Sequence, residues 1–436
     1  MSRATNPMMR SRAIHGGLWG LGALVLVGAI VSGCASQAEA MAEATSQATR
    51  AAVLPDTATQ AAAAIDAFGF DFYKSHLTSG GNAVVSPASI VLALSMAQAG
   101  AKGETAAQMD SVLHSAAGSG AGNGINSLDQ ILTGFSGTFK NANGTDQQLT
   151  LRIANAPFAQ NGLALQQPFL DTLASKYGAG LRLVDFRNDA AGACRLINSW
   201  VSGQTEGRIT KLLDSLDPAT RLVLVNAIYL KAPWQTPFDE KSTMTSPFTR
   251  SDGSQVSVPT MSLGLSEGRY ASGSGWQAVE LPYAARSLVM TIVVPDDLAA
   301  FESSLDAARF SQIAAALQPT HVDLTLPRFK IETKSDLSSA LAGMGMPLAF
   351  DPNGADFSGI TTQEQLHISK VVHQANIAVD EKGTEATAAT VVVMAAASAA
   401  PIQPVTVHVD RPFIFAVRDT GTGAILFLGR VVDPSA

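Results

Sequence analysis

Residues 379–401 read VDEKGTEATAATVVVMAAASAAP, and this stretch indicates what kind of protein the chain forms. Three charged residues and a glycine come near its start, and after Glu385 no charge occurs until Asp410. The residues between are small or prone to β-structure, which is unusual both for a packed helix and for a solvated linker. The composition therefore favours a segment that can become a strand.

Alternate positions of this stretch differ in character. Because side chains alternate between the two faces of a strand, one set could face a core while Glu385, in the other set, stays in water. The first set is small or apolar and never charged: Thr384, Ala386, Ala388, Thr390, Val392 and Met394.

The run DEKGTEATAAT at 380–390 closely resembles the hinge of the inhibitory serpins. The alternative is an Ala/Thr-rich flexible loop without a function. In serpins a protease cuts the loop and the hinge then inserts into a sheet, a known property of that family. The resemblance implies an α+β serpin fold with three β-sheets, about eight or nine helices and an exposed reactive-centre loop at about 381–404. The implied hinge residues are Glu381, Gly383, Thr384, Glu385, Ala386, Thr387, Ala388, Ala389 and Thr390.

The same resemblance locates the bond that a protease would cut. Counting along the hinge places it at Ala397–Ser398, whereas counting back from Pro412 places it a few residues later. No basic residue lies between Lys382 and Arg411, so trypsin-like enzymes are not expected as targets. Small apolar residues indicate elastase-like or subtilisin-like proteases. The other candidates in the window are Met394, Ala395, Ala396, Ala399 and Ala400.

Composition sets limits on the other classes of protein. Of the 436 residues, 46% are hydrophobic and 15% are charged, which suits a large buried core rather than disorder. Length alone does not decide between one large domain and two or three smaller ones. A formal net charge of −7 gives no reason to expect binding to nucleic acid or polyanions.

The N-terminus has the pattern of a secretory signal. Arg3, Arg10 and Arg12 precede an apolar stretch at 16–32. The sequence VSGC that ends at Cys34 resembles a bacterial lipobox, which implies cleavage before this cysteine and lipidation of its thiol. A membrane-spanning anchor is the alternative, although the apolar segment is short for one.

The expected organisation follows from this signal. We expect residues 1–33 to be a signal peptide, 34–58 to be a lipidated cysteine with a flexible tether, and 59–436 to be the serpin domain. The protein is then exported and lipid-anchored at the bacterial cell envelope, on the outer membrane or cell surface, or it is extracellular. Cys194 is the other cysteine, so an intramolecular disulfide is not expected, and a buried structural thiol is favoured over a catalytic one.

The stretch NAVVSPASI at 82–90 predicts the start of a helix. Ser86 is a suitable N-cap and Pro87 suits the first helical position. The helix that follows, to about Ala99, is apolar on almost every side and should be buried. The resemblance places Ser86 and Ser89 under the centre of the main sheet.

Two further strands carry isolated polar residues. The run 222–230 is apolar on both faces except for Asn226, which predicts a buried central strand and an amide that needs a partner. In the strand at 366–379, His373 lies on the apolar face, where a lone histidine is more often a satisfied core residue than a catalyst. The resemblance implies that His373 hydrogen-bonds Asn226 and that the two strands must part.

Other motifs extend the resemblance over about residues 60–434. The run NAIYLKAPW ending at Trp234 implies that this residue lies at the top of the sheet, where the loop first inserts. By the same resemblance, Glu381 should meet Arg328 of the LPRF motif. RPF at 411–413 and FLGRV at 427–431 are close to a family signature.

Motifs of enzymes are missing from the sequence. It contains no G-x-S-x-G elbow, H-E-x-x-H pair or Walker loop, and its glycine-rich stretch 115–125, expected to be a surface loop, lacks the phosphate-loop lysine. Ser86 and His373 have no acid placed to orient the histidine. We therefore expect no enzyme activity, metal or cofactor.

The function expected from the resemblance is suicide-substrate inhibition of serine proteases through a covalent complex. The alternatives that stay open are a non-inhibitory serpin that acts as a protease substrate or a carrier, and an inhibitor of cysteine proteases. Residues 127–139 contain no Lys or Arg, so we expect no heparin site. The protein should be a monomer.

Overall fold

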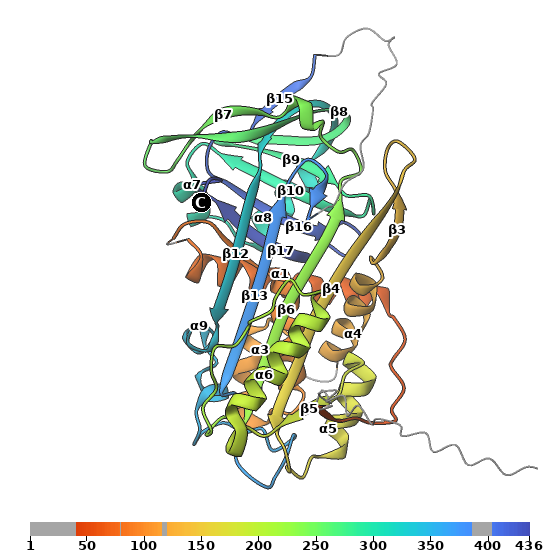
Figure 1. The fold of residues 1–436 in the computed structure, drawn as a ribbon, viewed down its shortest axis with the longest axis vertical. Coiled ribbons are helices and arrows are strands. Elements are labelled where there is room, and N and C mark those ends of the chain that lie inside the picture. The colour runs from red at the N-terminus through yellow and green to blue at the C-terminus, as the bar shows by residue number, and fades with distance from the viewer. Residues whose placement is uncertain (1–40, 79, 116–119, 386–402) are drawn as a thin grey trace, which may run out of the picture. The chain divides into compact units, whose positions relative to one another are not determined.

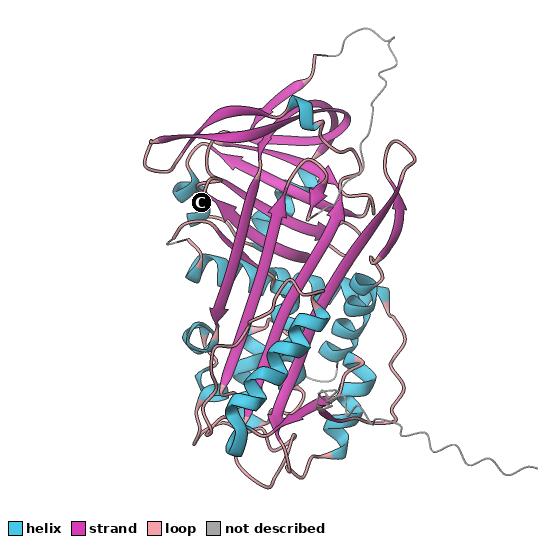
Figure 2. Ribbon diagram, viewed as in Figure 1, coloured by secondary structure: helices cyan, strands magenta, loops and turns pink. Residues whose placement is uncertain are grey.

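A computed structural model describes residues 41–78, 80–115, 120–385 and 403–436. Two large β-sheets and nine α-helices make up this part of the chain, which confirms the predicted α+β class. Figure 2 shows the long strands of one sheet with helices on both of its faces.

The main sheet has eight strands in the order β1-β5-β4-β6-β14-β13-β12, with β3 paired to β4. The long strands β4, β6, β13 and β12 lie side by side (Figure 1). The sequence explains β6, because almost all its residues are apolar and its two faces are both covered. The strands are β1 (Ala42–Ala44), β3 (Gly137–Lys140), β4 (Asp146–Gln160), β5 (Leu181–Val184), β6 (Leu222–Pro233), β12 (Phe329–Asp336), β13 (Lys370–Val379) and β14 (Gly383–Thr384).

The second sheet has nine strands in the order β15-β11-β8-β9-β10-β16-β17-β2, with β7 paired to β8. The 19 residues of β8 pair with β7, β11 and β9, so strands of the expected third sheet are continuous with the second through β8. The strands are β2 (Ala83–Val85), β7 (Met244–Thr249), β8 (Gln255–Gly273), β9 (Trp276–Pro282), β10 (Leu288–Pro295), β11 (Gln318–Pro327), β15 (Val405–His408), β16 (Phe413–Asp419) and β17 (Ile425–Val431).

The helices cover the main sheet from two sides. Helix α2 lies behind it and is buried along nearly its whole length, and Ser86 caps it as predicted by accepting the N–H of Ser89. Helix α6 packs in front, over β4 and β6 (Figure 1). The helices are α1 (Pro55–His76), α2 (Pro87–Gln98), α3 (Gly103–Val112), α4 (Gly120–Thr133), α5 (Gln167–Thr172), α6 (Phe186–Gln204), α7 (Leu298–Ser303), α8 (Ala307–Ala316) and α9 (Ser338–Met344), with the short helical turns η1 (Leu173–Tyr177), η2 (Glu240–Ser242) and η3 (Pro347–Phe350).

The glycine-rich stretch 115–125 is only partly the surface loop that was expected. Helix α4 already begins at Gly120. A Cβ at Gly124 would lie 2.6 Å from the carbonyl oxygen of Thr57, so glycine is what lets α4 pack so closely on α1. Gly124 therefore serves helix packing rather than a loop.

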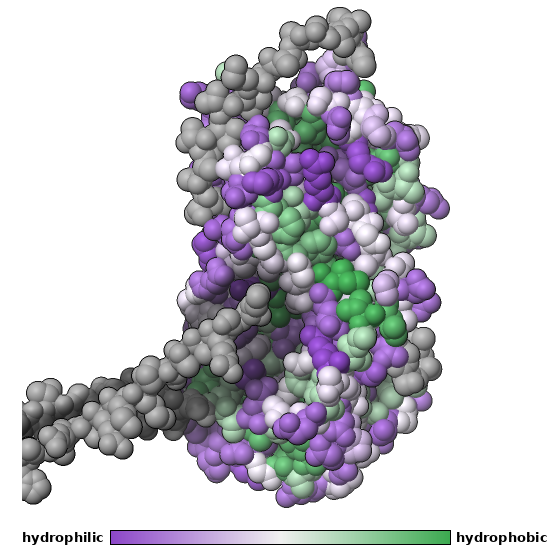
Figure 3. Space-filling view, turned by 90° about the vertical axis from the view of Figure 1, so that its right-hand side faces the viewer, coloured by the Kyte–Doolittle hydropathy of each residue, from purple (hydrophilic) through white to green (hydrophobic). Residues whose placement is uncertain are grey.

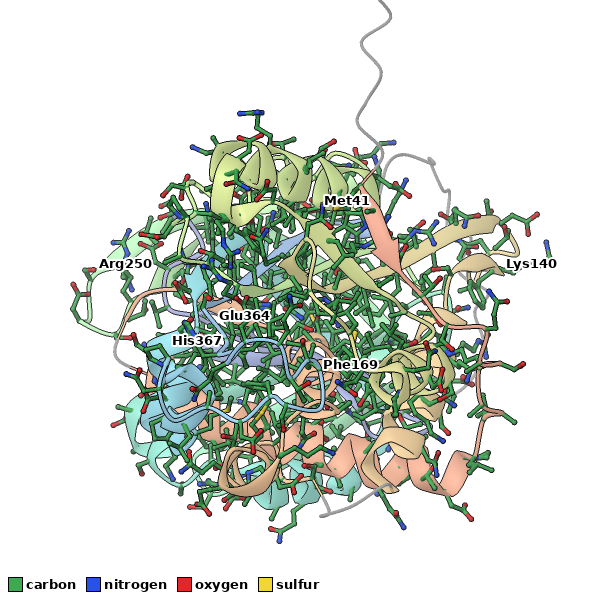
Figure 4. All side chains as sticks on the ribbon, turned by 90° about the horizontal axis from the view of Figure 1, so that it is seen from below. Met41, Lys140, Phe169, Arg250, Glu364 and His367 are labelled. Carbon is green, nitrogen blue, oxygen red and sulfur yellow. The ribbon has the colours of Figure 1, made fainter. Side chains whose placement is uncertain are left out.

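The N-terminal arm, residues 41–54, is the largest departure from the sequence-based prediction. The tether expected over 34–58 is wrong for residues 41–58, because β1 pairs antiparallel with β5 and α1 begins at Pro55. Met41 packs beside the residues that α6 buries, and Figure 4 shows it at the start of the arm. Edge pairing uses backbone groups, so it needs no apolar periodicity in the sequence. Cys34 lies outside the described residues.

Side chains hold the arm further along. Arg50 Nε donates to Asn126 Oδ1 at 3.1 Å, and the Arg50 guanidinium also pairs with Asp129 on α4. A Cβ at Gly178 would lie 2.8 Å from Arg50 Nη1, so this glycine leaves room for the guanidinium. The arm is thus bound to β5 at one end and to α4 at the other.

The surface next to the arm is mixed. Figure 3 shows hydrophilic residues spread over this face with small apolar areas between them. Val53 and Leu54, at 38% and 48% exposure, are the large hydrophobic residues that the arm exposes. None of the described helices combines the length and the apolar character needed to cross a membrane.

Replacing Arg50 should weaken the fold. We expect Arg50→Ala to lower the free energy of unfolding by about 1–2 kcal/mol, because it removes two side-chain contacts and leaves the half-buried Asp129 without its cation. Equilibrium unfolding in urea measures this.

The matched control is Lys140→Ala. Lys140 pairs with Asp146 with both side chains mostly in solvent, and it lies at the periphery in Figure 4. Removing this exposed pair should cost less than about 0.5 kcal/mol. Equal losses in the two variants would contradict the role assigned to the arm.

Candidate functional site

The start of the hinge is already part of the main sheet. Strand β14 pairs antiparallel with both neighbours, Thr384 lying opposite Ala232 of β6 and Val379 of β13. Lower down, β6 and β13 pair directly in parallel, from Lys370 opposite Val223 to Ala375 opposite Ile228. The two central strands are therefore parted only at the top, as Figure 1 shows.

Gly383 and Thr384 fill this opening. Gly383 has φ +152°, and a Cβ there would lie 2.1 Å from the carbonyl oxygen of Ala232, so only glycine fits. Thr384 is fully buried, and its Oγ1 lies 2.7 Å from the hydroxyl oxygen of Tyr283. Burial raises the pKa of Tyr283, which keeps this hydroxyl protonated.

Trp234 holds the turn that precedes β14. Its Nε1 donates to the carbonyl oxygen of Asp380 at 2.9 Å, and its backbone N–H donates to the carbonyl oxygen of Lys382 at 2.8 Å. Its ring stacks on Tyr283 with centroids 4.5 Å apart. Trp234 thus lies where the resemblance placed it, beside the inserted hinge.

Glu381 and Arg328 form the ion pair that the resemblance implied. Arg328 donates to Glu381 Oε1 from Nε at 2.8 Å and from Nη2 at 2.5 Å, and the hydroxyl of Thr243 also donates to it. Burial alone would raise the pKa of Glu381, but these hydrogen bonds outweigh it and hold the pKa below its ordinary value. Glu381 is therefore a buried carboxylate that stays charged.

Glu385 follows β14 directly and lies outside the strand, so the expectation for an inserted hinge is not tested, but in this state its side chain is largely shielded from water. Its side chain is only 12% exposed, and Oε2 lies 3.5 Å from Nε of Arg208. Burial raises the pKa of Glu385. The rest of the hinge, Ala386–Thr390, and the candidate bond at 397–398 with its window lie outside the described residues.

Below the hinge, a buried polar network joins the two central strands. His373 Nδ1 donates to Asn226 Oδ1, and His373 Nε2 accepts the backbone N–H of Ser86 at 3.2 Å, which fixes the tautomer. Asn226 Nδ2 donates to Ser89 Oγ at 2.6 Å and to Asn155 Oδ1 at 2.7 Å. The expected contact between His373 and Asn226 is present.

The network is not a catalytic site. Burial lowers the pKa of His373 to about 3, so the imidazole is neutral. Both ring nitrogens are used in hydrogen bonds, and the side chain of Ser86 caps α2. Cys194 is buried in α6 against the carbonyl oxygen of Leu213, and burial raises its thiol pKa, as suits the predicted structural thiol.

Sequence reasoning missed four residues of the site. Asn155 had a signal, because it follows the apolar residues Leu149, Leu151 and Ile153 at alternate positions, but the strand itself was not recognised. The others lacked such a signal, although Arg208 lies in the serpin-like run GQTEGRI at 203–209, and only the fold brings them to the hinge. They are Tyr283, Thr243 and Arg208.

The chain matches a known family over most of its length. A family model described as Serpin (serine protease inhibitor) matches residues 63–434. The chain belongs to the serpin family. Members of this family are protease inhibitors rather than catalysts. This serpin is 38% identical to a serpin-like protein of Thermococcus kodakarensis over 379 aligned residues. The aligned region covers 85% of each chain.

Two more relatives agree. The human leukocyte elastase inhibitor is 33% identical to this serpin over 367 residues, which covers 81% of this chain and 93% of the inhibitor. The native state of tengpin, a thermophilic serpin, superposes with a TM-score of 0.78 and 28% identity over 90% of this chain and 99% of tengpin. The match therefore covers nearly the whole of these relatives.

Protonation of Glu381 in acid should weaken the docking of the hinge, whereas protonation of Asp380 and Glu385, whose pKa values burial raises, acts in the opposite direction. Because the pKa of Glu381 is depressed below 4.5 in the docked hinge, its charge supports docking fully above that value, and this support is lost as the pH falls through the docked-state pKa. Emission from Trp234, which contacts the hinge, should change as the pH falls below about 4.5.

The control for this measurement is Glu381→Gln, which cannot titrate. It should lack the transition at Trp234, while a Trp234→Phe variant identifies the signal among the four tryptophans. A transition that persists unchanged in Glu381→Gln would show that another group controls docking.

Proposed function

We propose that this serpin is a suicide-substrate inhibitor of serine proteases. Its reactive-centre loop is offered as a substrate, and the cut hinge then inserts between β6 and β13 before the protease can complete hydrolysis. The observation that carries this proposal is the position of Thr384, fully buried between these two strands in the uncleaved chain.

The chemistry takes place at Ala397–Ser398. The serine of the protease attacks the carbonyl carbon of Ala397, the peptide bond breaks, and the amine of Ser398 leaves with a proton. The protease is now held as an ester on the N-terminal part of the chain. Insertion has to be completed before water attacks this ester.

Backbone hydrogen bonds favour the insertion. Full insertion replaces the parallel pairing of β6 with β13 by two antiparallel pairings, in the orientation that β14 already has. Antiparallel pairs are slightly more stable per residue, and each inserted residue satisfies groups that were in water. The reaction is therefore downhill once the strands part.

Small inward side chains keep this path open. After Thr384, the positions that alternate with it are Ala386, Ala388 and Thr390, none of which is charged. A charged residue there would be buried without a partner, which would slow insertion. This composition also argues against the non-inhibitory alternative, whose hinges tolerate bulky or charged residues.

The proposed targets are elastase-like or subtilisin-like proteases. The residue before the cut, Ala397, suits a shallow apolar pocket. The name of the human leukocyte elastase inhibitor, a relative at 33% identity, supports the same class. Inhibition of cysteine proteases is the second candidate, because the same loop could react with a thiol.

We further propose that Cys34 carries a lipid that anchors the protein at the bacterial cell envelope. The lipobox-like ending of the signal supports this proposal. The mass of the N-terminal peptide of the mature protein tests it, because an unmodified Cys34 or an uncut signal would contradict it.

Thr384→Arg should convert the inhibitor into a substrate. The arginine would have to enter the buried site beside Tyr283, so insertion slows and hydrolysis wins. The test mixes the soluble chain from residue 41 with an elastase and with a subtilisin. A denaturing gel then shows any covalent complex, and mass spectrometry identifies the released peptide.

The matched control is Thr384→Ser, which keeps the hydroxyl. We expect a covalent band from the parent and from Thr384→Ser, and only cleaved chain from Thr384→Arg. Full trapping by Thr384→Arg would overturn the insertion mechanism. Cleavage of the parent without any covalent band would favour the non-inhibitory alternative.

A further inference from the structure

The hinge takes one charged side chain into the top of the sheet. Glu385 is the only charged residue among 383–390, yet its side chain is 12% exposed and its Oε2 has no hydrogen-bond partner. Its backbone N–H donates to the carbonyl oxygen of Ala378 at 3.0 Å, so it is still attached to β13. With φ +49°, Glu385 has a left-handed backbone conformation, and β14 ends at the residue before it. Some neighbour has to offset the loss of water around this carboxylate.

Arg208 is the cation next to it. The two side chains approach to 3.5 Å, and the Arg208 guanidinium also lies 5.9 Å from the ring centroid of Tyr229 on β6. An ion pair at this distance, half shielded from water, is worth more than one at the open surface.

The loop after α6 holds Arg208 in place. Arg208 N–H donates to the carbonyl oxygen of Thr205 at 2.9 Å, and the buried Thr205 hydroxyl bonds to Val201 and Ile209. Glu206 and Gly207 have positive φ, which makes the turn that aims Arg208 at the hinge. The loop thus positions the backbone of Arg208 through contacts that do not involve the hinge.

Other charges near Glu385 do not replace Arg208. On β12, Lys330 is paired with Glu332 at 2.7 Å, and Glu332 itself repels the carboxylate of Glu385. Lys231 on β6 attracts it more weakly than Arg208 does. Among the described residues, Arg208 makes an ion pair with Glu385 alone.

We propose that Arg208 is a positioning residue that holds the hinge docked in the uncleaved protein by neutralising Glu385 as it leaves water. Without Arg208, the carboxylate is left half-buried beside Glu332, and the hinge leaves the sheet. With it, the first residues of the new strand are in place before any protease arrives. The consequence for inhibition rests on the proposed function, whereas the docking itself does not.

Hydrogen exchange of the hinge amides tests this in the absence of protease. We expect Arg208→Ala to speed exchange in the segment 383–385 about tenfold, and Arg208→Lys to restore most of the protection, because the charge is what matters. The matched control is Arg187→Ala. Arg187 is 53% exposed, close to the 51% of Arg208, but it pairs with Glu364, a residue of the lower end labelled in Figure 4.

A double variant separates charge pairing from a merely structural role. Glu385→Gln needs no cation, so Arg208→Ala should have almost no effect on exchange in that background. Equal acceleration in both backgrounds would overturn the proposal, and so would unchanged exchange in Arg208→Ala.

Trapping of protease is measured separately on the same variants. If the proposed function holds, Arg208→Ala should need several-fold more serpin per trapped elastase, because the hinge starts outside the sheet. If even the parent traps no protease, the proposed function fails, but the exchange result still decides the role of Arg208.

Discussion

The hydrogen bond between His373 and Asn226 joins β13 to β6, the two strands that separate in the proposed mechanism. It lies in the centre of the main sheet, within the stretch where β6 and β13 also pair directly through their backbones. A buried polar network is stable when it is complete and costly when it is partly broken, so intermediate openings of the sheet are disfavoured. Because Ser86, Ser89 and Asn155 extend the network into α2 and β4, parting the strands disturbs several elements at once. The sheet is therefore closed at this level until a new strand can take the place between β6 and β13.

At the top of the sheet, β6 and β13 are already apart, and the start of the hinge lies between them. Glycine at 383 and a small hydroxyl at 384 allow this, and Trp234, Tyr283 and the pair of Glu381 with Arg328 fix the turn. The chain thus contains both the start of the inserted strand and the barrier to its continuation. This arrangement is what the proposed mechanism requires, a stable resting form in which insertion has already begun.

Much of this was predictable from the sequence, because some signals are local. The cap at Ser86, the buried strand with Asn226 and the small residues of the hinge depend on nearby residues, and resemblance supplied the pairs of His373 and Glu381. Long-range placement was not predictable. Arg208 reaches Glu385 from the loop after α6, and the arm at 41–54 gains its hydrogen bonds from β5 and α4, although its own sequence has no apolar pattern. In both places distant elements cover polar or small residues whose own sequence predicts exposure to water.

The separation of β6 from β13 after cleavage tests the central claim most directly. Arg152 on β4 and Glu332 on β12 are exposed and lie on opposite sides of these strands, so spin labels there report the width of the sheet. One inserted strand should move the labels apart by about 5 Å, the spacing of neighbouring strands, when the reactive-centre loop is cut. An unchanged distance in fully cleaved protein would show that the loop does not insert, and the proposed mechanism of inhibition would be wrong.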